Sequence, residues 1–142
     1  EIHNHAVTIL KNTDWKHGLG KSIACAVKYI LDAKPITEAV LITLADQPLI
    51  DSDYLNDIIQ NFTPKENQII ATAYDLGKNG VPVLFDKTYF EALSKLSNDY
   101  GAKQLLEAYE SLVKTLKPPL KNVDLDSKED YEKLHNANFK IK

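Results

Sequence analysis

The chain has one cysteine, no methionine and no long apolar run, and each of these features excludes some classes of protein. Its one cysteine, Cys25, has no partner within the chain for a disulfide, so we expect a reducing compartment and predict a cytoplasmic protein. No apolar run reaches the ~18 residues that cross a bilayer, and the start has no basic stretch leading into an apolar one. The sequence therefore predicts no membrane span and no secretory signal.

No charge of one sign dominates. The 17 basic and 20 acidic residues are interspersed and give a formal net charge of −3. Without a basic stripe we expect no nucleic-acid partner, and the four histidines do not stand at a zinc-ligand spacing. With 142 residues and 44% apolar content, the chain fits one domain over residues 1–142. Because methionine is absent even at the start, we interpret it as the C-terminal portion of a longer domain.

Strand-like runs alternate with helix-like apolar spacing along the chain. This alternation predicts a three-layer α/β fold with a mostly parallel sheet. Pro82 predicts that its strand lies at an edge or that the proline begins the strand. The expected strands are residues 6–10, 38–44, 68–73, 81–85 and 112–116. The expected helices are residues 19–33, 52–62, 87–95 and 101–110, and a last one capped by Ser127.

Asp46 is the most informative acidic residue, because it follows the nearly continuous apolar run 38–44. Such a run is typical of a strand buried on both faces, and ligands of open α/β sheets bind beyond the carboxyl ends of the strands. A carboxylate there can hold Mg²⁺ together with substrate phosphates. The alternative is that Asp46 only caps the following turn.

Two further segments could carry chemistry. Asp124 and Asp126 flank Leu125, so in an extended segment both carboxylates point the same way, and a cation would offset their repulsion. The alternative is that Asp126 caps the last helix while Asp124 is solvated. Residues 18–22 place glycines at a helix start, where backbone N–H groups attract anions. The alternative, which this segment alone favours, is a helix entry without a ligand.

Five motifs in order resemble the MobA-like nucleotidyltransferases, and among them most closely the molybdenum cofactor cytidylyltransferases. They cover residues 12–134, nearly the whole chain. Asn12 to Ser22 is similar to the family pattern N-x-x-[WY]-x-x-G-[LM]-x-x-S. The segments at 44–48, 80–85, 98–103 and 124–130 resemble the patterns L-x-D-x-P, G-H-P-V-L-F, G-D-x-G-A-R and D-I-D-T-P-E-D.

This resemblance implies a Rossmann-like nucleotidyltransferase that transfers CMP, or GMP, from CTP or GTP to molybdopterin and releases pyrophosphate. It implies Mg²⁺ held by Asp46, with Asp126 or Asp124 as a second acidic contact, and therefore Asp46 and Asp126 as catalytic residues. A transient contact with molybdoenzyme maturation proteins is a further expectation. The remaining implied binding residues are Gly18 and Leu19 at the base, Ser22 near the nucleotide, and Gly80, Asp99 and Gly101 toward the pterin.

The chain departs from the family pattern in ways that limit the expected activity. It has no counterpart of the opening strand and its L-A-A-G-x-S-x-R-M-G loop, which cradle the triphosphate. Val81 stands where the family has histidine, and Lys103 where it has arginine, which keeps the charge but not the two-pronged geometry. We therefore expect residues 1–142 alone to be inactive. Alternatives are a sugar- or alcohol-phosphate nucleotidyltransferase and a non-catalytic binding domain.

Overall fold

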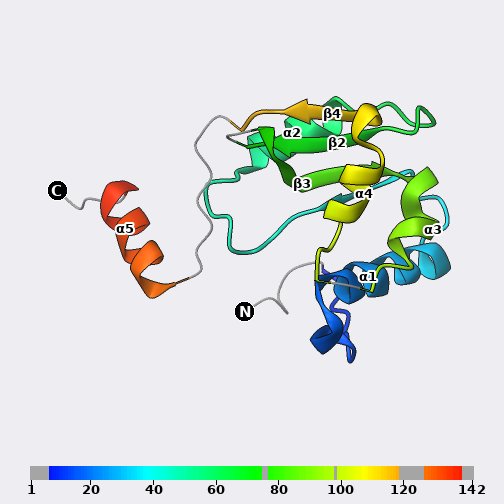
Figure 1. Ribbon diagram of the computed structural model, residues 1–142, viewed down its shortest axis with the longest axis horizontal. Helices are drawn as coiled ribbons and strands as arrows, with labels where there is room; N and C mark the ends of the chain where they lie inside the picture. Colours follow the sequence, from blue (N-terminus) through cyan, green and yellow to red (C-terminus); the bar gives the residue numbers. More distant parts are fainter. Residues whose placement is uncertain (1–6, 75–76, 98, 119–126, 139–142) are drawn as a thin grey trace.

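The described residues form one four-stranded sheet with helices on both faces (Figure 1). The computed structural model describes residues 7–74, 77–97, 99–118 and 127–138. The strand order is β1-β3-β2-β4. Strand β3 is antiparallel to both neighbours, whereas β2 and β4 are parallel, so three strands run one way and β3 runs the other. The strands are β1 (Ala39–Ile42), β2 (Ile69–Ala73), β3 (Asn79–Asp86) and β4 (Val113–Leu116).

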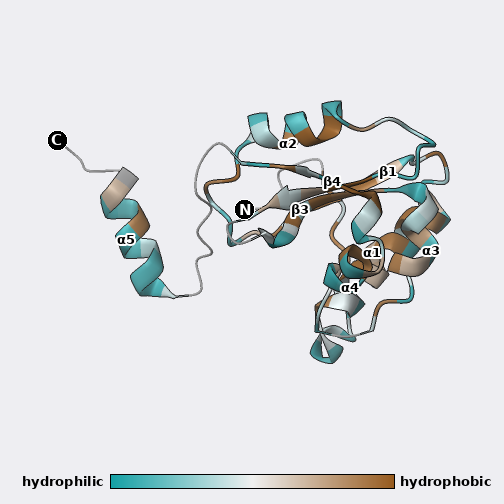
Figure 2. Ribbon diagram, turned by 45° about the horizontal axis from the view of Figure 1, so that its top comes forward, coloured by the Kyte–Doolittle hydropathy of each residue, from teal (hydrophilic) through white to brown (hydrophobic). Residues whose placement is uncertain are grey.

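The helices make two layers around the sheet, as Figure 2 shows with α2 on one face and α1, α3 and α4 on the other. Successive β3 side chains pack on opposite faces of the sheet: Phe85 lies in the core on the side of α1, and Leu84 in the core beneath α2. The predicted three-layer α/β fold is confirmed. The helices are α1 (Leu19–Ala33), α2 (Ser52–Gln60), α3 (Phe90–Leu93), α4 (Lys103–Ala108) and α5 (Lys128–Asn138). Short 3₁₀ turns are η2 (Trp15–His17), η4 (Lys87–Tyr89) and η5 (Glu110–Leu112).

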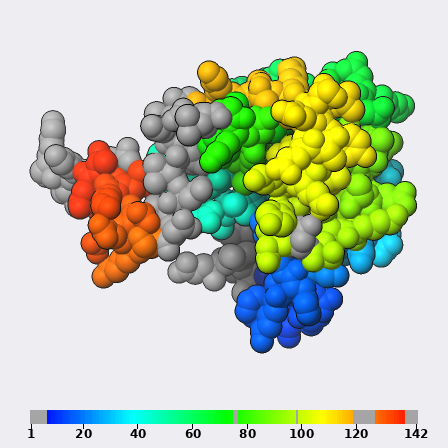
Figure 3. All heavy atoms as spheres, viewed as in Figure 1, coloured from blue at the N-terminus to red at the C-terminus, as the bar shows by residue number. Residues whose placement is uncertain are grey.

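Local sequence signals explain where several helices begin and end. Helix α1 stops at Ala33, two residues before Pro35, as predicted. Asp51 caps α2, because its carboxylate accepts a hydrogen bond from the backbone N–H of Tyr54 at 2.9 Å. Ser127 Oγ accepts from the N–H of Asp130 and so caps α5, which Figure 3 shows to one side of the layered body.

Two predictions about strands are wrong. Residues 7–10, the described part of the expected strand 6–10, form no ladder, and Val7 and Ile9 are more than half exposed. Strand propensity alone does not make a strand where no neighbour pairs with it. The strand containing Pro82 is central, not at an edge, and Pro82 lies inside it. A register shift opposite Ala71 and Thr72 leaves Val81 and Pro82 without ladder partners, so the missing N–H is tolerated at this bulge.

A buried hydroxyl network crosses the sheet beneath α2. The Tyr54 hydroxyl lies 3.0 Å from Thr72 Oγ1 and 3.0 Å from the Leu116 carbonyl oxygen. Thr72 in turn donates to the Pro82 carbonyl at 2.8 Å and so satisfies one acceptor of the bulge. Tyr54 and Thr72 are 2% and 0% exposed, so water cannot replace these bonds.

Tyr54→Phe is expected to lower the free energy of unfolding by about 1–3 kcal/mol, because it removes the hydroxyl that bridges Thr72 Oγ1 and the Leu116 carbonyl in a buried network. Burial raises the pKa of Tyr54 above 10.0. The native state therefore holds this proton more tightly than the unfolded chain does. The contribution of the protonated Tyr54 hydroxyl to the free energy of unfolding is complete below pH 10.0 and falls as the pH rises from there through the folded pKa. Urea unfolding at pH 7 and above pH 10 should show the difference between wild type and variant shrink. A difference that grows with pH would contradict this.

Candidate functional site

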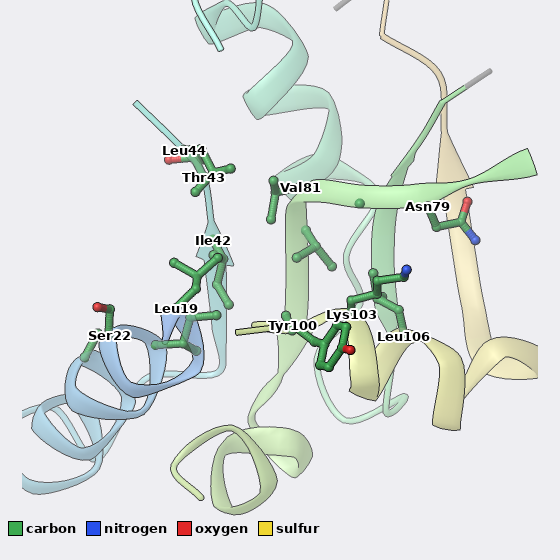
Figure 4. A pocket seen from close by; sticks show the side chains of 15 residues that line it. Leu19, Ser22, Ile42, Thr43, Leu44, Asn79, Val81, Tyr100, Lys103 and Leu106 are labelled. Atoms are coloured by element: carbon green, nitrogen blue, oxygen red, sulfur yellow. The ribbon is translucent and has the colours of Figure 1, made fainter. Parts of the chain in front are cut away.

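A pocket of about 400 Å³ opens at the carboxyl end of β1. Because β3 is antiparallel to β1, with Ile42 opposite Val83, the start of β3 lies beside the end of β1. Figure 4 shows side chains of α1 and β1 facing those of β3 and α4 across the pocket. The wall is mostly apolar. It consists of Leu19, Ser22, Ile23, Ala26, Ile42, Thr43, Leu44, Asn79, Gly80, Val81, Val83, Tyr100, Ala102, Lys103 and Leu106.

The loop before α1 is fixed at the pocket by its own side chains. Gly18 is buried at the N-cap with φ of 99°, a conformation that favours glycine. Asn12 Nδ2 donates to Ser22 Oγ at 3.0 Å, and Asn12 Oδ1 accepts from the backbone N–H of Asp14 at 2.9 Å. The asparagine therefore ties the loop to the first turns of α1 and positions Ser22 at the pocket wall.

Gly101 lets the α4 loop approach the start of α1. It is buried with φ of 55°, and a Cβ built on it would lie 3.0 Å from Leu19 Cδ2. Leu19, in contact with it, lines the pocket. A side chain at residue 101 would therefore both strain the backbone and push Leu19.

Gly101→Ala is expected to lower stability by about 1–3 kcal/mol through the left-handed backbone, with an added cost from the contact with Leu19. Gly77→Ala is the matched control, because Gly77 also has positive φ, 71°, but no described residue lies within 4 Å of its Cβ position. Chemical denaturation of both variants separates the two costs. Equal losses would mean that residue 101 has room for a side chain.

The bulge in β3 is tied to the turn after β1 through Tyr74. Gln47 is buried, and its Nε2 donates to the Tyr74 hydroxyl oxygen at 3.3 Å. The Tyr74 hydroxyl donates to the Val81 carbonyl oxygen, one of the groups that the bulge leaves without a ladder partner. The Tyr74 ring covers Gly80, where a Cβ would lie 3.1 Å from Tyr74 Cε2. Tyr74 therefore contacts both the pocket strand and the residue next to Asp46.

Asp46 lies in the turn just beyond Leu44, half-buried and outside the pocket wall. Its Oδ1 atom is buried and has no hydrogen-bond partner among the described residues. A buried carboxylate oxygen left in this way is costly, and a hard cation offsets the cost. The described part of the chain gathers no three acidic, histidine or cysteine residues that could enclose a metal. Asp46 therefore fits a cation that a ligand also coordinates.

The structure brings most of the predicted binding residues to one place. Leu19, Ser22 and Gly80 line the pocket, Gly18 is the N-cap of α1, and Gly101 lies close to the wall residue Leu19. Asp99 is exposed and does not line it. Asp124 and Asp126 lie outside the described residues. Several residues of the site were not marked by any sequence pattern: Thr43 and Asn79 in the wall, and the hydrogen-bonded pair Gln47 and Tyr74 outside it.

Comparison with known proteins identifies the family. The model of the MobA-like NTP transferase domain matches residues 1–113. The chain belongs to this family. It is similar to the purine catabolism protein PucB of Bacillus subtilis (strain 168), with 28% identity over 127 residues, 87% of this chain and 59% of PucB. No helix in the described part of this MobA-like chain is long and apolar enough to cross a membrane.

Solved structures give the same fold. Rv0371c of Mycobacterium tuberculosis H37Rv in complex with manganese matches with a TM-score of 0.62 and 26% identity over 76% of this chain and 57% of that one. A homolog from Mycobacterium sp. strain JC1 matches with a TM-score of 0.66 and 23% identity over 92% of this chain and 60% of that one. The MobA-like chain spans about six-tenths of the length of these relatives.

Proposed function

We propose that this chain is part of a nucleotidyltransferase that moves CMP, or alternatively GMP, from the nucleoside triphosphate to molybdopterin and releases pyrophosphate. The single observation that carries the proposal is the unpartnered, buried oxygen of Asp46 next to an apolar pocket, in a chain of the NTP transferase family. The manganese in the Rv0371c structure supports a divalent cation in the family. We propose Mg²⁺ here.

In this proposal Asp46 holds the cation, with Asp124 or Asp126 as a second acidic contact. The bound cation would neutralise charge on the phosphates as the acceptor phosphate attacks the α-phosphorus and pyrophosphate leaves. The chain's own contribution is placement: Ser22, held by Asn12, and the start of α1 orient the nucleotide, and Asp126 is the further catalytic carboxylate. Lys103 adds a positive charge at the pocket for the acceptor phosphate. Its ion pair with Glu107 is exposed and 3.6 Å long, so it holds the lysine only weakly.

The chemistry of the pocket favours a flat ring over a sugar as acceptor. Ten of its fifteen wall residues are apolar or glycine, and Tyr100 offers an exposed aromatic ring for stacking. A sugar has many hydroxyl groups, which lose water on binding and need polar partners that this wall does not supply in number. Gly80, Asp99 and Gly101 are proposed to face the pterin, and Gly18 and Leu19 the base.

Isothermal titration of the full-length protein with CTP, GTP and UTP in the presence of Mg²⁺ tests the proposal. We expect CTP to bind most tightly, and pyrophosphate release to require molybdopterin but not a sugar phosphate. Binding of no nucleoside triphosphate would refute the enzyme proposal and favour a non-catalytic domain. Turnover with a sugar phosphate but not with molybdopterin would mean that the acceptor is a sugar phosphate. Residues 1–142 alone are expected to release no pyrophosphate. The cytoplasmic location and the contact with maturation proteins stay predictions.

A further inference from the structure

Tyr74 lies outside the pocket wall, yet it contacts two parts of the site that are distant in sequence. One is the turn after β1, where Gln47 follows Asp46 directly. The other is the start of β3, where Gly80 and Val81 form part of the pocket wall. A single hydroxyl joins them, because it accepts from Gln47 and donates to the Val81 carbonyl oxygen. Backbone pairing does not connect the turn after β1 with the start of β3, because the ladder between β1 and β3 ends at Ile42 and Val83.

We propose that Tyr74 is a positioning residue that fixes the Asp46 carboxylate relative to the acceptor pocket. The inference rests on the proposed function, because it assumes that Asp46 holds a divalent cation. If Gln47 is anchored, the neighbouring backbone at residue 46 has little freedom, and the buried Oδ1 keeps its place without a hydrogen bond of its own. Residues that orient a metal-binding side chain strongly influence metal affinity and turnover.

Gly80 strengthens the inference because it makes the contact specific. The Tyr74 ring lies so close over Gly80 that a Cβ there would be 3.1 Å from Cε2. The ring therefore packs directly on Gly80 of β3, and its hydroxyl donates to the Val81 carbonyl oxygen. Removing only the hydroxyl leaves the ring packed on Gly80 but breaks both hydrogen bonds that connect the turn after β1 with β3.

Tyr74→Phe is therefore the test, and Tyr54→Phe is the matched control. Tyr54 also bridges two elements with a hydroxyl, but its partners are Thr72 and the Leu116 carbonyl rather than Gln47 and the Val81 carbonyl. In the full-length protein with CTP, electron paramagnetic resonance of free Mn²⁺ measures cation affinity, relative to the Mn²⁺ that the same concentration of CTP binds without protein. We expect Tyr74→Phe to weaken Mn²⁺ binding about tenfold and to lower kcat more than it raises KM for CTP. Tyr54→Phe should lower stability and leave Mn²⁺ affinity within about twofold of wild type.

A second variant keeps the test decisive if Tyr74→Phe folds poorly. Gln47→Leu breaks the same connection from the other end, and it should weaken Mn²⁺ binding to a similar degree. The double variant should lose little more than either single one, as expected for residues that act together. Unchanged Mn²⁺ affinity in Tyr74→Phe and Gln47→Leu, with clear binding by wild type, would overturn the positioning role alone. Absence of Mn²⁺ binding by wild type would overturn the proposed function and this role with it.

Discussion

Asp46→Asn in the full-length protein is expected to lower kcat for nucleotidyl transfer about a hundredfold or more, because the amide cannot neutralise a divalent cation. The same change should not destabilise the fold. It replaces a carboxylate whose buried oxygen has no partner among the described residues, so the free energy of unfolding should stay equal or rise by about 1 kcal/mol. Steady-state pyrophosphate release and urea unfolding measure the two effects. This combination distinguishes a functional residue from a structural cap.

Asp32→Asn is the control for Asp46→Asn, since Asp32 is an exposed acid near the end of α1, away from the pocket. It removes the same charge and should leave kcat unchanged. If Asp46→Asn kept wild-type kcat, the carboxylate would not hold the cation. If it instead lost stability without a specific loss of turnover, Asp46 would be a cap of its turn, the alternative reading of the sequence.

Ala26→Phe is expected to lower kcat/KM at least about tenfold by filling the pocket. Ala26 lies on α1 and lines the wall, and a volume of about 400 Å³ accepts a phenyl ring without overpacking the core. Displacing a bound ring of similar size removes apolar burial of about 1.5–3 kcal/mol, which corresponds to a loss of tenfold or more. Competition titration with CTP and with a free pterin should show which ligand the phenyl ring excludes.

Ala33→Phe on the same helix is the control, because Ala33 is exposed and not part of the pocket wall. It should leave kcat/KM at the wild-type value, and both variants should retain the stability of wild type. Unaltered kcat/KM in Ala26→Phe would mean that the substrates bind elsewhere on the sheet edge.

Part of the fold could be predicted from the sequence because it depends on local signals. The apolar spacing from Leu19 and the stop before Pro35 define α1, and Asp51 marks the start of α2. The direction of β3 was also within reach. Only residues 74–78 separate β2 from β3, too few for a parallel crossover, and the Tyr74 N–H bonds to the Lys78 carbonyl at 2.8 Å.

Other features depend on contacts that no local pattern encodes. A central strand normally excludes proline, and only the bulge that spares the Pro82 position from the ladder explains its place in β3. Residues 7–10 have the composition of a strand but no neighbour to pair with. The partnership of Gln47 and Tyr74 joins residues 27 positions apart through side chains. Spacing and propensity cannot indicate such a pair. By contrast, the family motifs did indicate Gly18, Gly80 and Gly101 at the pocket.

A crystal structure of the full-length protein with Mn²⁺ and a non-hydrolysable CTP analogue tests most directly whether Asp46 holds the cation. Anomalous scattering locates the manganese without ambiguity. We expect a peak about 2 Å from an Asp46 carboxylate oxygen, with phosphate oxygens completing the coordination. Manganese bound elsewhere, with the Asp46 carboxylate hydrogen-bonded only to its own turn, would contradict a cation-binding role for Asp46.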